Sequence, residues 1–242
     1  MKPMNIIVEL AGRDSVVAFY RLLKQSASRI PAPSNSFILS IVNAAPEYGT
    51  VSCGDPIDMA CKLKKLAENY GQTVHEVATE YKPDIWFNMV KSGCLGYTNT
   101  NFISPCLMCH TYCHLMRLPI ALKYGYDYIL TGERSSHDGK LKVNQNEKVF
   151  KSIDSFFNSY GITLVRPLEH VENTEIIKKE YSDLCRELGV DENYFTFTPC
   201  YLEGSGKIDN QRDLDIFLAN NLYKVVPIME EMVKQYDLDT RK

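Results

Sequence analysis

The sequence predicts an α/β fold: a doubly wound parallel sheet of about five strands with helices on both faces and a short helical C-terminal tail. Two observations predict this class. Short β-rich runs alternate with longer helical patterns, as in βαβ units, and several runs are continuously apolar, as in strands covered on both faces. The 242 residues are 45% hydrophobic and 24% charged, which excludes disordered, collagen-like and coiled-coil chains.

The expected strands cover residues 5–10, 37–43, 74–81, 128–131 and 162–166. The first helix follows a turn at Gly12 and is capped by Asp14 or Ser15. Further helices are expected over residues 55–71, 84–91, 106–124 and 174–188, with two short ones from residue 209 onward. Pro119 must kink the helix over residues 106–124 or start a new turn there. No linker divides the chain, so we expect one α/β domain over residues 1–206 with a helical extension over residues 207–242.

Charge and hydropathy limit the partners and the compartment. The chain has 27 basic and 30 acidic residues, a net charge of -3, so no bulk positive field draws it to nucleic acid or to a membrane. Its apolar runs are far shorter than the roughly 20 residues that cross a bilayer, and the first residues lack a signal-peptide pattern. We therefore expect a soluble, cytoplasmic protein with no membrane partner. In a reducing compartment its eight cysteines are core residues, metal ligands or reactive thiols rather than disulfides.

The turn after the first strand is a candidate nucleotide site. A glycine turn that feeds a helix presents backbone N–H groups to an anion, although an ordinary βα turn is the alternative. The segment Leu10-Ala11-Gly12-Arg13-Asp14-Ser15 resembles the Ser-Gly-Gly-x-Asp-Ser signature of the PP-loop ATP pyrophosphatase superfamily, with Leu10 in place of Ser and Ala11 in place of Gly. The resemblance implies ATP bound by Leu10 to Ser15, with Asn43 and Ala44 beside the adenine. It also implies cleavage between the α and β phosphates to adenylate a substrate, with Asp14 as a candidate Mg²⁺ ligand.

Three cysteines share one face of the expected helix over residues 106–124. Cys106, Cys109 and Cys113 are spaced i, i+3 and i+7, and thiolates are the preferred ligands of zinc and iron-sulfur clusters. An ordinary core helix is the alternative. Cys106-x-x-Cys109-His110 also has the spacing of a c-type haem attachment, but that requires export and a haem pocket. Histidines beside such ligands usually orient them rather than bind the metal.

The order of motifs around this helix carries a second resemblance. Cys106-x-x-Cys109, Arg117 and the run from Ala121 to Gly132 resemble the core of tRNA 2-thiocytidine synthetases and related cluster-dependent thiolases, which are PP-loop enzymes. The likeness spans most of residues 5–206. It implies Cys200 as the third ligand of a 4Fe-4S cluster with one open iron. Cys113 is then either a fourth ligand or a neighbour that does not touch the metal.

The residues after the fourth strand lie where parallel sheets bind ligands. The related thiolases have Gly-His-His-x-Asp-Asp there; this chain keeps Gly132, whereas Glu133 and Arg134 replace the two histidines. We expect Glu133 to bind Mg²⁺, Arg134 to neutralise phosphate charge, and His137 or Asp138 to move protons. A solvated loop is the alternative. A lysine-rich stretch follows, either a local basic patch or a solvated face: Lys140, Lys142, Lys148 and Lys151.

Three functions remain open. The first is an adenylating PP-loop enzyme that transfers sulfur through its cluster to a nucleobase, with tRNA, a sulfur donor and a homodimer as partners. Relatives carry an RNA-binding module, for which this chain has neither spare length nor positive charge. The second is therefore an ATP-dependent ligase or amidotransferase on a small molecule, similar to 7-cyano-7-deazaguanine synthases, with Zn²⁺ on the cysteines. The third, motivated by Leu10 and Ala11, is a non-catalytic nucleotide- or metal-binding module.

Overall fold

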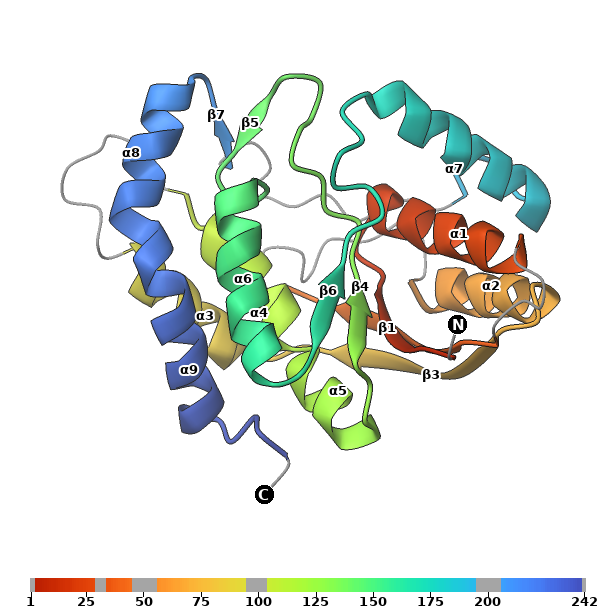
Figure 1. Ribbon diagram of the computed structural model, residues 1–242, viewed down its shortest axis with the longest axis horizontal. Helices are drawn as coiled ribbons and strands as arrows, with labels where there is room; N and C mark the ends of the chain where they lie inside the picture. Colours follow the sequence, from red (N-terminus) through yellow and green to blue (C-terminus); the bar gives the residue numbers. More distant parts are fainter. Residues whose placement is uncertain (1–2, 29–33, 45–55, 95–103, 195–205, 241–242) are drawn as a thin grey trace.

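A five-stranded parallel sheet forms the centre of the molecule (Figure 1). The computed structural model describes residues 3–28, 34–44, 56–94, 104–194 and 206–240. The strand order is β3-β2-β1-β4-β6. Their bounds are β1 Asn5–Glu9, β2 Ser36–Val42, β3 Thr73–Glu80, β4 Tyr128–Leu130 and β6 Thr163–Val165. The order reverses between β1 and β4, and such a switch point is where open parallel sheets bind ligands.

Helices cover both faces of the sheet, which confirms the predicted fold class. Along β1, Ile6 and Val8 point into one apolar cluster, and Ile7 points into the other, because side chains alternate across a strand. One face carries α1 (Arg13–Ala27), α2 (Pro56–Asn69) and α7 (Thr174–Leu188). The other carries α3 (Pro83–Cys94), α4 (Cys106–Leu115), α5 (Leu118–Tyr124), α6 (Glu147–Ser159), α8 (Gln211–Asn221) and α9 (Val225–Gln235).

The five expected strands and the helix over residues 174–188 are confirmed, with small shifts at the ends. The expected helix over residues 106–124 is two helices, because Pro119 lies in the first turn of α5 and starts a new helix there. The N-cap of α1 was predicted wrongly. It is Gly12, and Ser15 Oγ accepts hydrogen bonds from the N–H groups of Ala11 and Gly12, at 3.0 Å each.

Two features were not predicted. The helix α6 begins after Asn146, whose side chain accepts a hydrogen bond from Val149 N, so a capping signal was present in the sequence. A small antiparallel sheet pairs β5 (Leu141–Lys142) with β7 (Lys207–Ile208). A strand of two residues is too short to show the alternation of apolar and polar side chains by which strands are recognised in a sequence.

The segment after residue 206 packs on the rest of the chain. β7 pairs with β5, and α8 and α9 contribute to the apolar cluster that contains α4 and α6. A domain boundary at residue 206 stays a prediction. Within the described ranges, no helix has the length and apolar content needed to cross a bilayer.

Gly132 brings the end of β4 into direct contact with α1. A Cβ atom built on Gly132 would lie 2.2 Å from Ser15 N and 2.4 Å from Ser15 Cα. These are backbone atoms, so they cannot move aside as the end of a flexible side chain does. The missing side chain at this position is therefore what lets the α1 turn lie against the end of β4.

We predict that Gly132→Ala lowers the free energy of unfolding by about 1–3 kcal/mol, because it overpacks this contact. Urea denaturation measures the change. Gly12→Ala is the matched control, since a Cβ there meets nothing within 4 Å and its φ of -177° is ordinary extended backbone; it should cost about 0.5 kcal/mol or less. Equal losses in the two variants would contradict the proposed contact.

Candidate functional site

A cavity of about 530 Å³ lies at the switch point, where β1 and β4 end. Among the described residues, four parts of the chain form its walls. The first is the end of β1 with the α1 turn: Glu9, Ala11, Gly12, Arg13, Asp14 and Ser15. The others are α4, with Cys106, Cys109, His110 and Cys113; the β4 end, with Gly132, Glu133 and His137; and the β5 and β7 region, with Lys142, Asn144, Gln145, Gly206 and Lys207. The nucleotide motif and the cysteine motif thus face one cavity.

The α1 turn is closed by its own serine. Ser15 Oγ donates to Gly12 O at 2.7 Å while accepting from the two amides of Ala11 and Gly12. The expected donation from Ser15 to phosphate therefore requires this hydroxyl to leave the turn. The N–H groups of Arg13 and Asp14, in the first turn of α1, have no acceptor within the helix. They lie at the positive end of the helix dipole, which favours an anion.

Asp14 faces the cavity but is paired with an arginine. Its Oδ2 accepts a hydrogen bond from Arg134 Nε at 2.9 Å. The rest of the Arg134 guanidinium donates to Val171 O, Glu172 O and Thr174 Oγ1 around the start of α7. Arg134 is only 3% exposed and does not line the cavity. In the structure Arg134 therefore holds Asp14, and its expected contact with phosphate stays a prediction.

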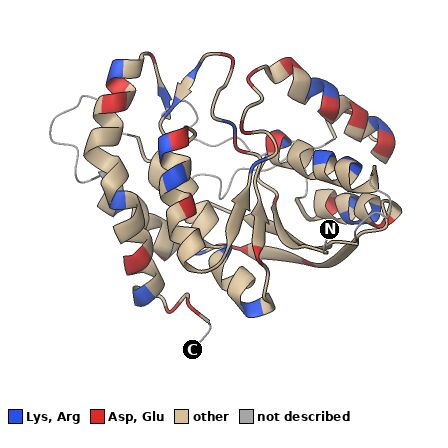
Figure 2. Ribbon diagram, in the orientation of Figure 1, with Lys and Arg blue, Asp and Glu red and all other residues tan. Residues whose placement is uncertain are grey.

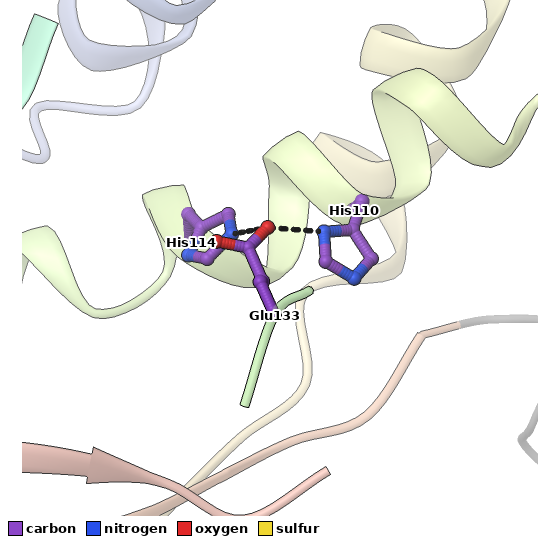
Figure 3. A group of neighbouring side chains, drawn as sticks. All are labelled: His110, His114 and Glu133. Atoms are coloured by element: carbon purple, nitrogen blue, oxygen red, sulfur yellow. Dashed lines mark hydrogen bonds and ion pairs between the residues drawn. The ribbon is translucent and has the colours of Figure 1, made fainter. Parts of the chain in front are cut away.

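Glu133 is almost fully buried and joins three elements. Its Oε1 lies 3.0 Å from His114 Nε2 and 3.2 Å from His110 Nδ1, both on α4 (Figure 3). Its Oε2 accepts from Arg166 Nε, just after β6, at 2.7 Å and from Thr131 Oγ1 at 3.2 Å. Burial alone would raise the pKa of Glu133, but the charge of His114 and the hydrogen bonds from both histidines outweigh it and hold the pKa well below its usual value. Glu133 is therefore a carboxylate at neutral pH.

The three cysteines of α4 are partly exposed to the cavity. Cys109 Sγ accepts a hydrogen bond from Trp86 Nε1 of α3 at 3.2 Å. Cys106 faces Gly206, where an added Cβ would lie 3.1 Å from Cys106 Sγ. Cys113 lies one turn further along α4, and its carbonyl accepts from Arg117 Nη1 at 2.6 Å. Cys200, the expected third ligand, lies outside the described residues.

The two remaining expected catalytic residues, His137 and Asp138, differ in whether they reach the cavity. His137 lines the cavity and is 8% exposed. Burial, followed by the charges of Lys142 and Arg134, lowers the pKa of His137 to about 4, so its ring is neutral at physiological pH. Asp138 does not line the cavity. Its carboxylate accepts hydrogen bonds from Thr174 N, at 2.8 Å, and from Thr174 Oγ1. That pairing places Asp138 at the start of α7 and outside the cavity.

Other expected positions do not reach the cavity. Leu10 is 3% exposed and belongs to the core. Asn43 N donates to Glu80 O at 2.9 Å, and Asn43 O accepts from Tyr112 Oη; neither Asn43 nor Ala44 lines the cavity. The adenine position of these two residues stays a prediction.

The positive charge at the site is local. Lys142 lines the cavity, and burial lowers its pKa, whereas Lys148 pairs with Asp215 at an exposed surface. Lys207 and Arg13 also line the cavity. Figure 2 shows acidic and basic residues interspersed along α7 rather than separated into faces of one sign. Of the four lysines expected as a basic patch, Lys142 lines the cavity and Lys148 does not; the patch itself stays a prediction.

Sequence reasoning gave no role in the site to several buried charged residues. Glu9 and Arg117 form a buried ion pair with 3.4 Å between Oε1 and Nη2, which connects the end of β1 to α4. Arg166 contacts both Glu133 and Asp154, at 2.7 and 2.8 Å. The sequence did contain a signal for them: each pair includes a charged residue beside a continuous apolar run. Such a residue is expected to be buried, and a buried ionic side chain needs a partner of opposite charge.

Comparisons with known proteins were made on the whole chain. No protein-family model matches it. A protein of Methanocaldococcus jannaschii, described as uncharacterized, is 22% identical over an alignment of 241 residues that covers 95% of this chain and 79% of that relative. The solved U34-tRNA thiolase NcsA from Methanococcus maripaludis, with its 4Fe-4S cluster, aligns over 100% of this chain and 75% of its own, with a TM-score of 0.43 and 17% identity. An identity of 17% and a TM-score of 0.43 carry no functional argument. The function proposed for this chain therefore rests on its own residues.

The low pKa of His137 predicts a pH-dependent contribution to stability. Between about pH 4 and pH 6.5 the unfolded state binds a proton at this position that the folded state does not. Stability should therefore fall as the pH drops through this window, by at most about 1.4 kcal/mol per pH unit. Urea unfolding of the wild type and of His137→Gln, measured from pH 7 to pH 4, tests this: the difference between them should shrink as the pH falls. A constant difference, or an NMR titration of the ring near pH 6.5, would contradict it.

Proposed function

We propose that the chain is an ATP-dependent adenylating enzyme of the PP-loop type that transfers sulfur to a nucleobase through a cysteine-bound 4Fe-4S cluster. One observation carries the proposal: the Ala11 to Ser15 turn and the three α4 cysteines line the same cavity. An adenylated substrate is short-lived in water, so the sulfur must be delivered where activation occurs. Two distant sites would not allow this.

The cysteines suit an iron-sulfur cluster. Cys106, Cys109 and Cys113 are partly exposed on the cavity side of one helix, and thiolates are the usual ligands of these clusters. The Trp86 N–H bonded to Cys109 Sγ is the kind of contact that tunes a cluster. Cys106, Cys109 and Cys200 are the proposed ligands. The cluster would supply an iron that can carry sulfide.

The α1 turn is the proposed phosphate site. Its helix N-terminus favours anions, and Arg13, Lys142 and Lys207 place positive charge in the same cavity. Nucleotide binding requires the amides of Ala11 and Gly12 to exchange Ser15 Oγ for phosphate oxygens. Asp14 would become a Mg²⁺ ligand, which requires it to release Arg134.

The nucleobase and its carrier are part of the proposal. A tRNA would place one base at the cavity, where Arg13, Lys142 and Lys207 could meet its phosphates, although the net charge of the chain is -3. Two alternatives are a small-molecule ligase with zinc on the cysteines and a module without catalysis. Metal analysis and pyrophosphate release distinguish them from the proposed enzyme.

We predict that protein purified without oxygen is brown and contains about four iron and four sulfide per chain. The double variant Cys106→Ser/Cys109→Ser and the single variant Cys200→Ser should lose the iron and the sulfide. The exposed Cys61 of α2 provides the matched control Cys61→Ser, which should keep both. Colourless wild-type protein with zinc on these cysteines would overturn the cluster. Unchanged iron in Cys200→Ser would overturn the ligand set.

We further predict that Asp14→Asn lowers the release of pyrophosphate from ATP about 100-fold, because it removes a Mg²⁺ ligand worth several kcal/mol at the transition state. Glu180→Gln is the matched control. Glu180 binds Arg21 at 2.7 Å, also joins α1 to α7, and does not line the cavity. Equal losses in the two variants would mean that Asp14 acts only by holding the helices together. Absence of pyrophosphate release by the wild type would favour the module without catalysis.

A further inference from the structure

His110, His114 and Glu133 form a group whose function the proposed cluster does not explain. Among the described residues, one ligand atom from each lies within 4.8 Å of the other two. Both histidines extend from α4 toward the carboxylate of Glu133, which enters from the end of β4 (Figure 3). The three α4 cysteines are not members of this group.

The spacing is suited to a metal ion. Residues at i and i+4 lie on one face of a helix, so His110 and His114 can present two imidazoles to one ion, as paired histidines do in helical zinc sites. Two histidines and one glutamate are a common ligand set for zinc. The set uses nitrogen and oxygen donors only, which separates it chemically from the neighbouring thiolates.

We propose that His110 Nδ1, His114 Nε2 and Glu133 Oε1 bind one divalent transition-metal ion, zinc by the donor set, at a site distinct from the cysteines. Glu133 Oε1 lies 3.2 Å and 3.0 Å from the two nitrogens. Ligands of a tetrahedral zinc with bonds of about 2.0–2.1 Å lie about 3.3 Å apart. Both pairs that include Oε1 are therefore close to the spacing of a zinc site, and all three ligand atoms lie within 4.8 Å of one another. The metal would replace the contacts of the two histidines with Oε1.

The surroundings hold the ligands in place. Arg166 and Thr131 occupy Oε2 of Glu133 and leave Oε1 for the ion. Arg166 is itself paired with Asp154. The side-chain amide of Gln145 lies 3.4 Å from His110 Nε2, the ring nitrogen that does not face Glu133. Such outer contacts orient the ligands of metal sites.

The ion would lie in the cavity wall. His114 is fully buried behind it, whereas His110 and Glu133 line the cavity. Three protein ligands leave a fourth position, as in zinc sites that act on substrates, and that position faces the same cavity as the α1 turn. An oxygen ligand, from water or an anionic substrate, fits there.

The test uses the full-length chain with Cys106, Cys109, Cys113 and Cys200 changed to Ser, stripped of metal by a chelator. Co²⁺ is the probe, because its visible bands report coordination and its thiolate complexes have a distinct near-ultraviolet band. We expect one equivalent of Co²⁺ to bind with visible bands and no thiolate band, and one equivalent of Zn²⁺ to displace it. Zn²⁺ should also raise the melting temperature.

In that background, His110→Ala should weaken Co²⁺ binding at least about 100-fold, since removing an orienting group already costs 10- to 100-fold. His110 is 24% exposed, so this variant should fold; circular dichroism checks it. His114→Ala should behave alike, and His137→Ala, which removes a cavity histidine outside the group, should leave binding unchanged. The proposal is overturned if the chain with these four cysteines changed binds no Co²⁺, or if His110→Ala and His114→Ala bind it as tightly as their parent. Because the chain tested has no α4 thiols and no Cys200, this result is independent of the cluster.

Discussion

The buried carboxylate of Glu133 is the interaction on which the site depends. It connects the end of β4 to α4 through two histidines and to the end of β6 through Arg166. A buried charge is costly unless it is paired, and removing one partner of a buried ionic group leaves the others uncompensated. This network therefore fixes α4 relative to the sheet, and with α4 it fixes the three cysteines.

The switch point explains why the two motifs share a cavity. The chain leaves β1 through the turn that starts α1, and it reaches β4 only after α4 and α5. Because β1 and β4 are adjacent and parallel, both ends open at one edge of the sheet. Gly132 allows the α1 turn to lie against β4, and the Glu9 to Arg117 pair connects the end of β1 to α4. The α1 turn and the thiol-bearing helix α4 are thus held side by side, as the proposed coupling of activation and sulfur transfer requires.

Much of the fold was predictable from periodicity. The buried strands are continuously apolar, and α7 ends at Gly189 in the left-handed region, so local chemistry determines both. The small sheet of β5 and β7 depends on long-range pairing of two-residue strands, which no local pattern records. For the site, spacing predicted Cys106, Cys109 and Cys113 on one face, and the order of strand, turn and helix predicted the α1 turn as a candidate nucleotide site; both line the cavity. Spacing could not predict that Glu133 turns toward α4 or that Arg134 turns toward α7, because those directions depend on partners distant in sequence.

The central claim is that the nucleotide phosphates and the cysteine-bound metal share one cavity. Phosphorus NMR relaxation of a bound, non-hydrolysable ATP analogue tests it, since an unpaired electron on a reduced iron-sulfur cluster accelerates relaxation only of nearby nuclei. The account predicts strongly accelerated relaxation in the cluster-loaded protein and none in Cys106→Ser/Cys109→Ser. Bound nucleotide whose phosphorus relaxation is the same with and without the cluster would contradict it.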